Sequence, residues 1–564
     1  MIDWPDRRSG RLPLVCLLAS LTVLAACGGS SSTSDDRSPD PNADLPAAIT
    51  VAPEGPPRTG GTLVYALEAE SDGFDPTRNR FAPSGTIVGL AVYDPLAAFD
   101  ADLEPRPYLA ESMTPSADYL RWTIKVRPDI TFHDGAPLDG VALKTFFDRA
   151  RADALVGIAV RNIDAVELDP TDPLAVVISM KEPWAAFPVT LTGQLGMVTA
   201  PSMADDPDSG RNPVGTGPFV FAEWVPDNRF VATRNPTYWR SDADGNRLPY
   251  LERVEFRPIA DVQTRNASLE AGNVDMMHTT NPRDIATFQG KASAGELQIV
   301  LDQGEKEELF VMLNTKVAPF DDVRVRRALA HATDREQYNT VINDGRREIA
   351  DGVFSEGSKW KVDAPYPDYD PAAAQALVDE YEAEVGPIRF TLADSGTDSR
   401  GIDLLKQQWE AVGIEVDTEL VEQSKFVINA ALGDYEAYSW RQFGGVDPDY
   451  DYVWWTSENS AEPGQGVALN FARNENPAID AALKRGRSSP DPAVRREAYA
   501  EVQRLINEDL PYIWLDRAQW AVVARTQVRG ITNGPLPDGT AANPIGGPGG
   551  FGGVTFLTQT WLAG

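Results

Sequence analysis

Residues 213–239 read PVGTGPFVFAEWVPDNRFVATRNPTYW, a stretch that predicts a glycine–proline turn followed by two apolar strands. Phe219 and Trp224 lie in the first run, and a second run starts at Phe230 after a Pro-Asp-Asn turn. The two glycines that flank Thr216 permit backbone angles and close approaches that a side chain would block. A hairpin of this kind occurs in many mixed sheets, so by itself it indicates no function.

Further strings occur in order along the chain: FDP at 74–76, YDPL at 93–96, FHDGAPL at 132–138 and FDDVRVRRAL at 320–329. Together with VGTGPF and NPTYW in the first stretch, they resemble the signatures of the extracytoplasmic solute-binding proteins of ABC transporters, in the peptide-binding family 5. The resemblance covers about residues 60–564. It implies an α/β fold of the periplasmic-binding-protein type II, with two hinged lobes that each contain a mixed sheet and a small inserted third domain.

The resemblance also implies how the chain is divided. Lobe I is discontinuous and comprises residues 59–98, 205–306 and 523–564, whereas a smaller domain II (99–204) is inserted into it and lobe III comprises 307–522. The chain therefore passes between lobes I and III twice, near 306 and near 522. Two such connections form a hinge, on which we expect the lobes to close over a ligand.

Length and composition limit the possible functions. A chain of 564 residues is too long for one core, and a hydrophobic fraction of 42% with 13 tryptophans is enough to build two or three. The net charge of −33 repels phosphate backbones, so nucleic-acid binding is excluded. Beyond the N-terminus the sequence has no hydrophobic run long enough to span a bilayer.

The first 26 residues carry the features of a lipoprotein signal peptide. Arg7, Arg8 and Arg11 are followed by an apolar run over 12–26 that is short for a membrane span. The sequence Leu-Ala-Ala-Cys-Gly that follows resembles a lipobox, in which Cys27 is acylated and becomes the mature N-terminus. The alternative is a plain signal peptide with an incidental cysteine.

Residues 27–58 are rich in Ser, Asp and Pro, and we expect them to form a disordered tether. Acyl chains stabilise membrane attachment by ~0.8 kcal/mol per buried CH₂, so the protein is expected to be anchored by lipid to the outer face of the cell membrane. The other cysteine, Cys16, lies in the part removed, so the mature protein is predicted to contain no disulfide.

Hydrophobic periodicity and capping residues predict the main elements. A helix is expected to start after the Asp-rich segment 319–323, because acidic residues at a cap and first turn suit the helix dipole. Segment 242–246 is predicted as a hairpin tip, and the glycine-rich segment 546–553 as an irregular loop. Strands are predicted over 60–66, 120–127, 175–180, 254–258, 309–314, 388–392, 414–420 and 511–515, and helices over 140–152, 260–271, 401–412 and 492–509.

The sequence offers little support for an enzyme. His133, His278 and His331 are far apart, and the HExxH, GxSxG and P-loop patterns are missing. His133 is expected to lie in a structural turn. Gly215-Thr216-Gly217 lacks the third glycine and the opening helix of a dinucleotide-binding fingerprint. We therefore name no catalytic residue and no cofactor.

One pattern resembles a calcium-binding loop. Asp447, Asp449, Asp451 and Glu458 occupy positions 1, 3, 5 and 12 of the calcium-loop template, whereas position 6, which requires glycine, is Tyr452. The competing interpretation, which we favour, is that this is an acidic and aromatic segment of a binding cleft.

The same region is the best candidate for binding a ligand, because residues 438–450 combine aromatic side chains, glycines and charges. The alternative is that its aromatic residues are core and its acids are solvated. The candidate ligand-binding residues, with two from the first lobe, are Arg80, Phe81, Trp440, Arg441, Phe443, Gly444, Asp447 and Tyr450.

The resemblance raises a question about the ligand. In peptide-binding relatives an aspartate three residues before the Asp-Pro pair holds the ammonium group of the ligand, and that position matches Gly444 here. Some relatives carry an acid where this chain has Arg80, and Arg441 adds a further positive charge. We therefore hypothesise an anionic or polyhydroxyl ligand group that meets Arg80 or Arg441. Unchanged binding by an Arg441→Ala variant would contradict this hypothesis.

Taken together, the residues and the resemblance predict the substrate-binding lipoprotein of an ABC importer. It is expected to act as a monomer, to capture a peptide or peptide-like solute, and to deliver it to two permease subunits that work with cytoplasmic ATPases. The alternatives are a receptor of the same fold for nickel or another metal chelate, a secreted hydrolase, and a lipoprotein that senses or chaperones peptides without transport. The low number of histidines argues against direct metal ligation.

Overall fold

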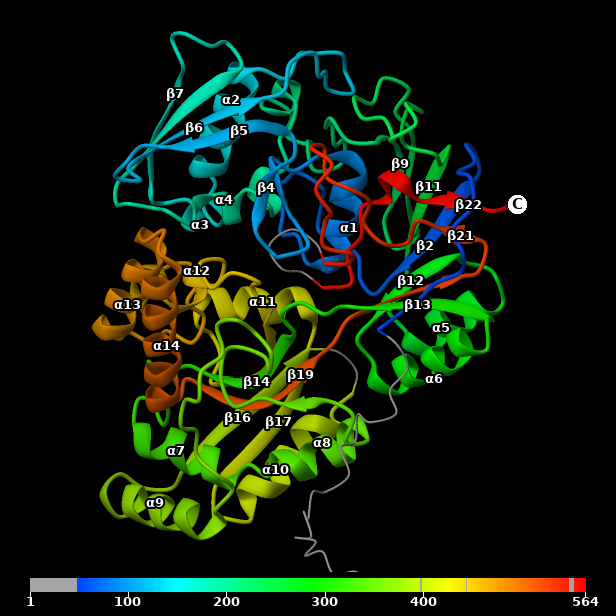
Figure 1. The fold of residues 1–564 in the computed structure, drawn as a ribbon. Helices are drawn as coiled ribbons and strands as arrows, with labels where there is room; N and C mark the ends of the chain where they lie inside the picture. The colour runs from blue at the N-terminus through cyan, green and yellow to red at the C-terminus, as the bar shows by residue number, and fades with distance from the viewer. Residues whose placement is uncertain (1–47, 396–397, 443, 547–551) are drawn as a thin grey trace, which may run out of the picture. The chain divides into compact units, whose positions relative to one another are not determined.

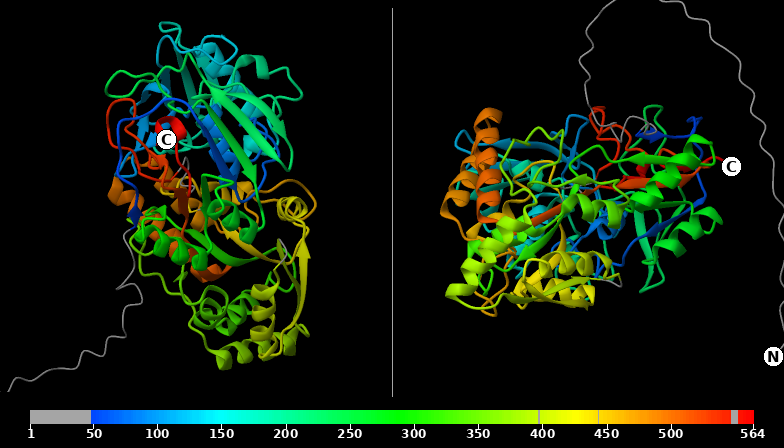
Figure 2. Two further views of the ribbon diagram at one scale, coloured as in Figure 1. Left: turned by 90° about the vertical axis from the view of Figure 1, so that its right-hand side faces the viewer. Right: turned by 90° about the horizontal axis from the view of Figure 1, so that it is seen from below.

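The structure, a computed structural model, describes residues 48–395, 398–442, 444–546 and 552–564. These residues belong to one compact unit that extends from Pro46 to Gly564. Cys27 and the predicted signal peptide lie outside the described residues. The three largest sheets in the described part have eight, six and four strands. In Figures 1 and 2 the yellow and orange segments lie around the six-stranded sheet, whereas the blue, cyan and red segments lie away from it.

The eight-stranded sheet is mixed and combines strands from both ends of the chain in the order β1-β13-β20-β12-β2-β11-β10-β9. Parallel pairs join β2 to β11 and to β12, and the other pairs are antiparallel. Its strands are β1 Ile49–Thr50, β2 Thr62–Leu67, β9 Phe219–Val225, β10 Arg229–Arg234, β11 Arg253–Pro258, β12 Met276–Thr279, β13 Leu297–Leu301 and β20 Ala521–Arg525. Helix α1 (Pro83–Val92) packs on one face, and α5 (Val262–Glu270) and α6 (Pro282–Ser293) contribute to the core on the other.

The stretch at 213–239 forms the predicted hairpin, in which β9 pairs with β10. Its glycine turn lies directly against the end of α1, since a Cβ on Gly217 would come within 2.5 Å of the carbonyl carbon of Val92. Both ends of the stretch bind the buried carboxylate of Asp94, which accepts hydrogen bonds from three side chains: Thr216 at 3.1 Å, Tyr238 at 2.8 Å and Trp239 at 2.9 Å. These contacts explain why the glycine turn and the distant Tyr-Trp pair occur together.

Burial raises the pKa of Asp94 to about 6, against which the hydrogen bonds from Trp239 and Tyr238 act. The carboxylate therefore depends on these donors to remain ionised at neutral pH.

The four-stranded sheet is antiparallel, in the order β5-β6-β8-β7. Helix α2 (Gly140–Ala152) packs against it and begins at Asp139, whose carboxylate accepts from the N–H groups of Val141 and Ala142. The helix has the predicted bounds because this cap fixes its start. The strands are β5 Ala110–Pro115, β6 Arg121–Val126, β7 Ile163–Leu168 and β8 Ala175–Met180, and nearby are α3 Val156–Ala159, α4 Phe187–Thr190, β3 Ala97–Phe99 and β4 Pro105–Pro107.

The six-stranded sheet has the order β15-β19-β14-β18-β16-β17. Strands β16 and β17 are parallel and joined by α10, as the β-α-β prediction for this region requires. The strands are β14 Glu307–Leu313, β15 Glu348–Ile349, β16 Arg389–Ser395, β17 Glu415–Val421, β18 Ala437–Gln442 and β19 Tyr512–Ala518. The helices are α7 Val323–Ala332, α8 Arg335–Asn343, α9 Pro371–Glu384, α10 Arg400–Glu410, α11 Gln423–Leu432, α12 Tyr452–Trp455, α13 Pro477–Ser488 and α14 Pro492–Asp509.

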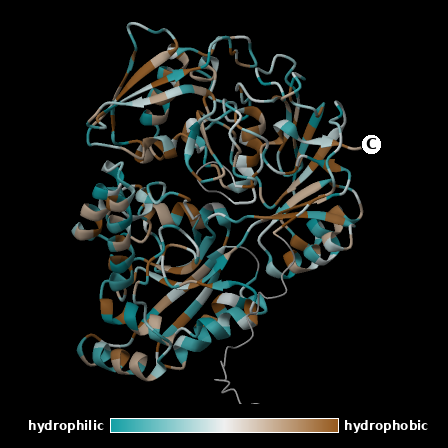
Figure 3. Ribbon diagram, viewed as in Figure 1, coloured by the Kyte–Doolittle hydropathy of each residue, from teal (hydrophilic) through white to brown (hydrophobic). Residues whose placement is uncertain are grey.

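The helices that cover this sheet are amphipathic. In Figure 3 they carry both hydrophilic and hydrophobic turns, whereas the central strands of the eight-stranded sheet are more uniformly hydrophobic. Helix α14 has the predicted bounds, and the predicted helix after 319–323 is α7, capped by Asp322. In the part of the chain that the structure describes, no helix combines the length and the apolar character that crossing a membrane requires.

Two connections link the eight- and six-stranded sheets: residues 302–306 between β13 and β14, and residues 519–520 between β19 and β20. They are bound to each other. The N–H of Asp302 donates to the carbonyl oxygen of Trp520 at 2.9 Å, and the side chain of Gln519 donates to the carbonyl oxygen of Asp302 at 2.9 Å.

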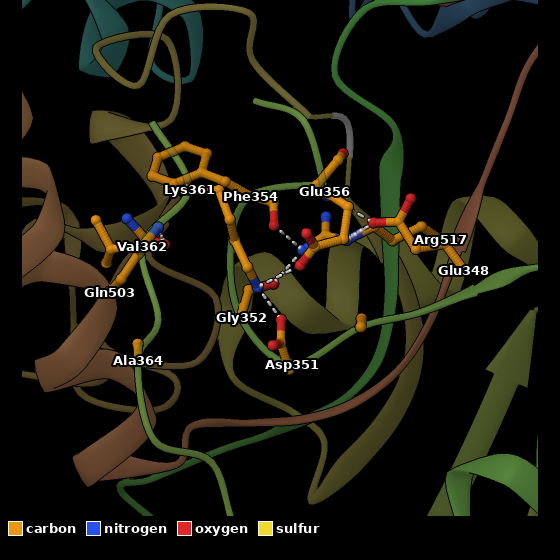
Figure 4. Close-up of polar contacts among 12 residues, drawn as sticks. Glu348, Asp351, Gly352, Phe354, Glu356, Lys361, Val362, Ala364, Gln503 and Arg517 are labelled. Atoms are coloured by element: carbon orange, nitrogen blue, oxygen red, sulfur yellow. Dashed lines mark hydrogen bonds and ion pairs between the residues drawn. The ribbon is translucent and has the colours of Figure 1, made fainter. Parts of the chain in front are cut away.

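A buried guanidinium group stabilises the region beside these connections. Arg517, which is 1% exposed, donates to the carbonyl oxygens of Gly352 and Phe354, each at 2.6 Å, and lies 3.3 Å from Glu348 (Figure 4). It also faces Glu308 at 3.6 Å. Arg517 thus faces carboxylates near the start of β14, where Lys306 also pairs with Glu348 at 2.5 Å and Arg441 pairs with Glu307 at 3.1 Å.

The expected tether at 27–58 needs a correction at its end. Residues 48–58 are described, and Ile49–Thr50 form edge strand β1, paired with β13. The amide of Ala52 donates to Gln298 at 2.7 Å. Apolar and β-branched residues at 49–51 favour pairing with an open sheet edge, which the overall Ser/Asp/Pro composition concealed.

The remaining predictions concern loops and the C-terminus. Segment 242–246 is a turn closed by a single bridge between Ser241 and Arg247. Most of the predicted loop at 546–553 falls outside the described residues. The last short elements are β21 Val528–Arg529, β22 Trp561–Leu562 and the 3₁₀ turns Gln194–Gly196, Pro201–Met203, Ser457–Asn459 and Leu557–Gln559.

Candidate functional site

A large pocket lies between the two largest sheets and the inserted four-stranded region. Its volume is about 1080 Å³. Segment 79–82 before α1, residues between 155 and 195, and residues between 394 and 471 all contribute to its wall. This volume exceeds what one amino acid would fill, so the pocket suits a ligand of several residues or of similar size.

One end of the pocket is formed by the carboxyl ends of parallel strands. Strands β16 and β17 run parallel, as do β16 and β18, and they end at Ser395, Val421 and Gln442. Residues at or next to these three ends line the pocket. Open α/β sheets bind ligands at such an edge, because the strand ends and the loops that follow them surround a crevice there.

The wall at this end is aromatic. The ring of Phe426 stacks on Tyr438 with centroids 3.9 Å apart and on Trp440 at 5.4 Å. Phe471 contacts Trp440 at 5.2 Å and Trp454 at 5.3 Å. Rings packed against one another lose little further freedom when a ligand binds, so this wall is a preorganised apolar surface.

Arg441 lies between the two largest sheets. Its guanidinium is 2.8 Å from Glu68, which follows β2, and 3.1 Å from Glu307 on β14, and it lies over the ring of Trp520 at 5.5 Å. Burial raises the pKa of Glu68, but the charge and hydrogen bond of Arg441, together with the smaller effects of His278 and Arg265, outweigh burial and hold the pKa below its usual range. Burial raises the pKa of Glu307 to about 7 despite Arg441.

The other arginines of the pocket wall are also paired. Arg80 is 3.2 Å from Asp72 at the surface, and Arg487 is 2.7 Å from the buried carboxylate of Asp449. The hypothesis of an anionic ligand group depended on unmatched positive charge at Arg80 or Arg441. Since both guanidinium groups have carboxylate partners, such a ligand would have to compete with them.

The structure brings most of the predicted site residues together. Arg80, Phe81, Trp440, Arg441 and Tyr450 line the pocket. Phe443 lies outside the described residues.

Gly444 and Asp447 are not among the residues that line this pocket. A Cβ on Gly444 would lie 2.6 Å from the carbonyl oxygen of Lys306, so this position has no room for the aspartate of peptide-binding relatives. Asp447 is buried and pairs with Arg495 at 2.6 Å.

Three of the four carboxylates of the calcium-loop pattern already have partners within the protein. The carboxylates of Asp447 and Asp449 pair with arginines, and Asp451 accepts a hydrogen bond from the N–H of Gly445 at 3.2 Å. Among the described residues, no group of three or more His, Cys, Asp or Glu side chains has the arrangement of a metal site.

The three histidines have separate structural contacts. The ring of His133 is 3.0 Å from the carbonyl oxygen of Gly217, in the turn where it was predicted. His278 accepts from the N–H of Glu68 at 3.1 Å and stacks on Trp520. Burial lowers the pKa of His278 to about 4, so its ring is neutral at physiological pH.

Sequence reasoning missed several residues of the pocket. Trp184 comes from the inserted region and donates to Asp449 at 2.7 Å, and Phe426 comes from α11. Glu68 directly follows β2, and Asp394 lies at the end of β16; both line the pocket. The position of Asp394 at the end of a predicted parallel strand was a usable signal, because such ends meet at one edge of the sheet.

The sequence as a whole matches a known family. The model described as "Bacterial extracellular solute-binding proteins, family 5 Middle" matches residues 104–463. The chain belongs to this family. Family 5 proteins are solute-binding receptors, and the matched region contains the four-stranded sheet and most of the residues of the pocket wall.

Two curated relatives illustrate which members of family 5 resemble this chain. The glutathione-binding protein GsiB of Pectobacterium atrosepticum is 26% identical over 472 residues, which cover 80% of this chain and 88% of GsiB. The di/tripeptide-binding protein 2 of Pseudomonas aeruginosa is 26% identical, covering 87% of this chain and 96% of that protein.

Solved structures of family 5 proteins share the fold. The periplasmic binding protein DppA of Helicobacter pylori, in complex with the peptide STSA, matches with a TM-score of 0.77 at 22% identity over 90% of this chain and 98% of DppA. NikA of Brucella suis, in complex with Fe(III)-EDTA, matches with a TM-score of 0.68 at 24% identity over 83% of this chain and 96% of NikA. The same fold thus accommodates ligands of different chemistry.

Proposed function

We propose that this protein is the substrate-binding component of an ABC importer and captures a peptide or peptide-like solute in the pocket between its two largest sheets. The observation that carries the proposal is the pocket itself, a cavity of about 1080 Å³ with an aromatic wall at the carboxyl ends of parallel strands. The names of the two curated relatives, one for glutathione and one for di- and tripeptides, support a ligand of this class.

The mechanism we infer is closure around the ligand without covalent chemistry. The lobes would be residues 59–98 with 205–306 and 523–564, and residues 307–522, with domain II at 99–204. The ligand would contact both lobes, and its extra contacts in the closed state would drive closure. The closed form would then dock on permease subunits that work with ATPases.

Attachment to the membrane is part of the proposal. An acyl group on Cys27 would anchor the protein on the outer side of the membrane. Residues 27–47 of the tether predicted at 27–58 lie outside the described residues. A monomer is sufficient for this role, since the pocket is built from one chain.

Binding of defined solutes tests the proposed function. The mature full-length protein should bind apolar di- to tetrapeptides, with a change in tryptophan emission because Trp184, Trp440 and Trp454 line the pocket. A ligand at 100 times its Kd stabilises the folded protein by about 2.7 kcal/mol, so the unfolding temperature should rise measurably. Mass spectrometry of solutes that co-purify with the protein would identify the class independently.

The alternatives give different results in the same assays. Binding of a nickel–histidine complex without binding of any peptide would favour a metal-chelate receptor. Cleavage of a peptide or ester panel by the purified protein would favour a hydrolase and contradict the proposal. Peptide binding that is retained when no permease can be isolated with the protein would favour a sensor or chaperone.

A further inference from the structure

A buried cluster joins the inserted four-stranded region to the helices beside the six-stranded sheet. Trp184, which follows β8, donates its indole N–H to the carboxylate of Asp449 at 2.7 Å. The other oxygen of Asp449 accepts from Arg487 of α13 at 2.7 Å. These three side chains are 0%, 2% and 7% exposed, so the contact, which we call the junction, is shielded from water.

The two sides of the junction also meet through the main chain and through aromatic rings. The carbonyl oxygen of Arg487 accepts from the N–H groups of Ala185 at 2.9 Å and Ala186 at 3.3 Å. Its guanidinium lies over the rings of Trp184 at 4.3 Å and Tyr452 at 3.4 Å. Arg487 is thus placed between one ring from each side, and cation–π attraction adds to its ion pair.

Trp184 is fixed to the inserted region by packing. It belongs to the core of the four-stranded sheet and packs on Phe187 with ring centroids 5.0 Å apart. Its carbonyl oxygen accepts from the indole of Trp122 on β6 at 2.9 Å. A movement of the inserted region therefore carries Trp184 with it and leaves Asp449 paired with Arg487.

The path of the chain makes the junction depend on where the two largest sheets lie. The chain enters the inserted region after α1 and leaves it before β9, and both elements belong to the eight-stranded part. The junction, in contrast, lies beside α12 and α13 of the six-stranded part (Figure 1). If the two largest sheets separate about 302–306 and 519–520, as the proposed function requires, Trp184 must leave Asp449.

The junction can open without leaving an unpaired buried charge. After separation Asp449 and Arg487 remain an ion pair that water can solvate, so only the indole hydrogen bond and the packing on Trp184 are lost. A hydrogen bond to a charged group contributes more than one between neutral groups. The indole N–H is therefore the group whose removal weakens the junction most selectively.

The contact around the junction is incompletely packed. A second cavity, of about 230 Å³, lies between the two sides and is lined by Glu182 from one side and by Tyr452 and Glu458 from the other. Lys484 of α13 pairs with Glu182 across this boundary at 3.0 Å, and neither side chain is buried. A polar contact with space beside it is typical of parts of a protein that move relative to each other.

The junction is also part of the large pocket. Trp184, Asp449 and Arg487 all line it. A ligand that fills the pocket covers the junction from that side and excludes water, which strengthens the hydrogen bonds there. Binding of the ligand and closing of the junction should therefore favour each other by the same free energy, because such coupling is reciprocal.

We propose that Trp184 and Asp449 are positioning residues of the ligand-bound state: their hydrogen bond holds the inserted region against the six-stranded part and slows release of the ligand. This inference rests on the proposed function. It adds to closure of the two lobes a role for the inserted region, which forms the third wall of the pocket only while the junction is closed.

Hydrogen exchange tests the junction with or without a ligand, because the amides of Ala185 and Ala186 exchange only when their bonds to Arg487 break. The variant Trp184→Phe of the mature full-length protein removes the indole N–H and keeps an aromatic ring. We expect these two amides to exchange about tenfold or more faster in this variant than in the wild type. Mass spectrometry of the peptide that contains them gives the rates.

Trp409→Phe is the matched control. The indole of Trp409 donates to Thr333 at 3.0 Å, is equally buried, and lies outside the pocket wall. Both variants should unfold at a lower temperature than the wild type, but only Trp184→Phe should change exchange at Ala185 and Ala186. Only Trp184→Phe should release the tripeptide Leu-Phe-Leu faster, by about tenfold, with little change in its association rate.

A charge swap separates closing of the junction from direct contact between Trp184 and the ligand, since neither Glu182 nor Lys484 lines the large pocket. Glu182→Lys should raise both the exchange rate and the dissociation rate of Leu-Phe-Leu by roughly two- to fivefold, because it repels Lys484. The double variant Glu182→Lys/Lys484→Glu should restore both rates. Stopped-flow fluorescence gives the dissociation rates.

The outcomes separate the two proposals. The inference is overturned if Ala185 and Ala186 exchange no faster in Trp184→Phe than in Trp409→Phe. If Leu-Phe-Leu binds and leaves every variant at the wild-type rate, the inference likewise fails and the peptide receptor stands. If exchange responds to Trp184→Phe and to the charge swap but Leu-Phe-Leu does not bind, the junction stands and this peptide class is removed from the proposed function.

Discussion

At the scale of single residues, one connection between the sheets contains a buried carboxylate, that of Asp302. Asp302 is 6% exposed, and its carboxylate accepts from the N–H of Gly304 at 2.8 Å. Burial nevertheless raises the pKa of Asp302 to about 7. A folded-state pKa above the ordinary value of 3.8 means that the folded protein binds more protons than the unfolded chain between about pH 4 and pH 7.

Stability should therefore decrease as the pH rises through this window, and the Asp302→Asn variant should lose that part of the decrease. The carboxamide can still accept from Gly304 but carries no charge. We expect the variant to be more stable than the wild type by roughly 1–3 kcal/mol at pH 8, with little difference at pH 4.5. Urea denaturation at both pH values measures this. The exposed control Asp244→Asn should shift neither curve, and an equal effect of both variants would contradict the prediction.

At the scale of elements, the hairpin of β9 and β10 depends on close backbone contact. A methyl group on Gly217 would meet the backbone of Val92 at the end of α1, and neither backbone can move without displacing the Asp94 hydrogen bonds. The short turn and its two glycines are thus fixed by packing between a helix and a sheet.

We expect Gly217→Ala to destabilise the protein by about 2 kcal/mol or more, because overpacking against backbone is relieved only by shifting it. Gly290, in helix α6, provides a matched control, since nothing lies within 4 Å of its added Cβ. Gly290→Ala should stabilise the protein by roughly 0.5–1 kcal/mol through helix propensity. A Gly217→Ala variant that is as stable as the wild type would contradict the role of backbone contact at Gly217.

At the scale of the whole molecule, Arg441 holds the two largest sheets together. Without it, Glu68 and Glu307 would face each other in a poorly solvated site. Removing one partner of such a group leaves charges uncompensated, which costs more than the loss of a surface ion pair.

Arg441→Ala should therefore lower the free energy of unfolding by about 2 kcal/mol or more, whereas Arg80→Ala should change it by less than about 1 kcal/mol. The urea midpoints of the two variants give the comparison. Equal midpoints would contradict a structural role for Arg441. Ligand affinity measured with the same variants also tests the hypothesis of an anionic ligand group, which predicts a loss of binding in at least one of them.

Much of the fold could be predicted from local sequence. Helices α2 and α14 start at aspartate caps and follow a clear apolar period, so their bounds were predicted correctly. Strand β1 was missed because a strand of two residues is too short to show an alternation of apolar and polar residues. The pocket was predicted only in part, since its wall joins segments far apart in the chain: Trp184 and Asp394 become neighbours of one cavity only after the sheets assemble. Charge pairing, which decides what Arg441 can bind, is likewise a property of the assembled molecule.

The hydrogen bonds between the two connections have a mechanical consequence. Because Asp302 is bound both to the backbone of Trp520 and to the side chain of Gln519, the paired segments should bend as one pivot instead of two independent links. Twisting or sliding of one half against the other would break these bonds, whereas bending about them would not. A hinge of this kind would bring the aromatic wall and Arg441 back to the same position each time the two halves close. The selectivity for the ligand would then be the same in every cycle of binding and release.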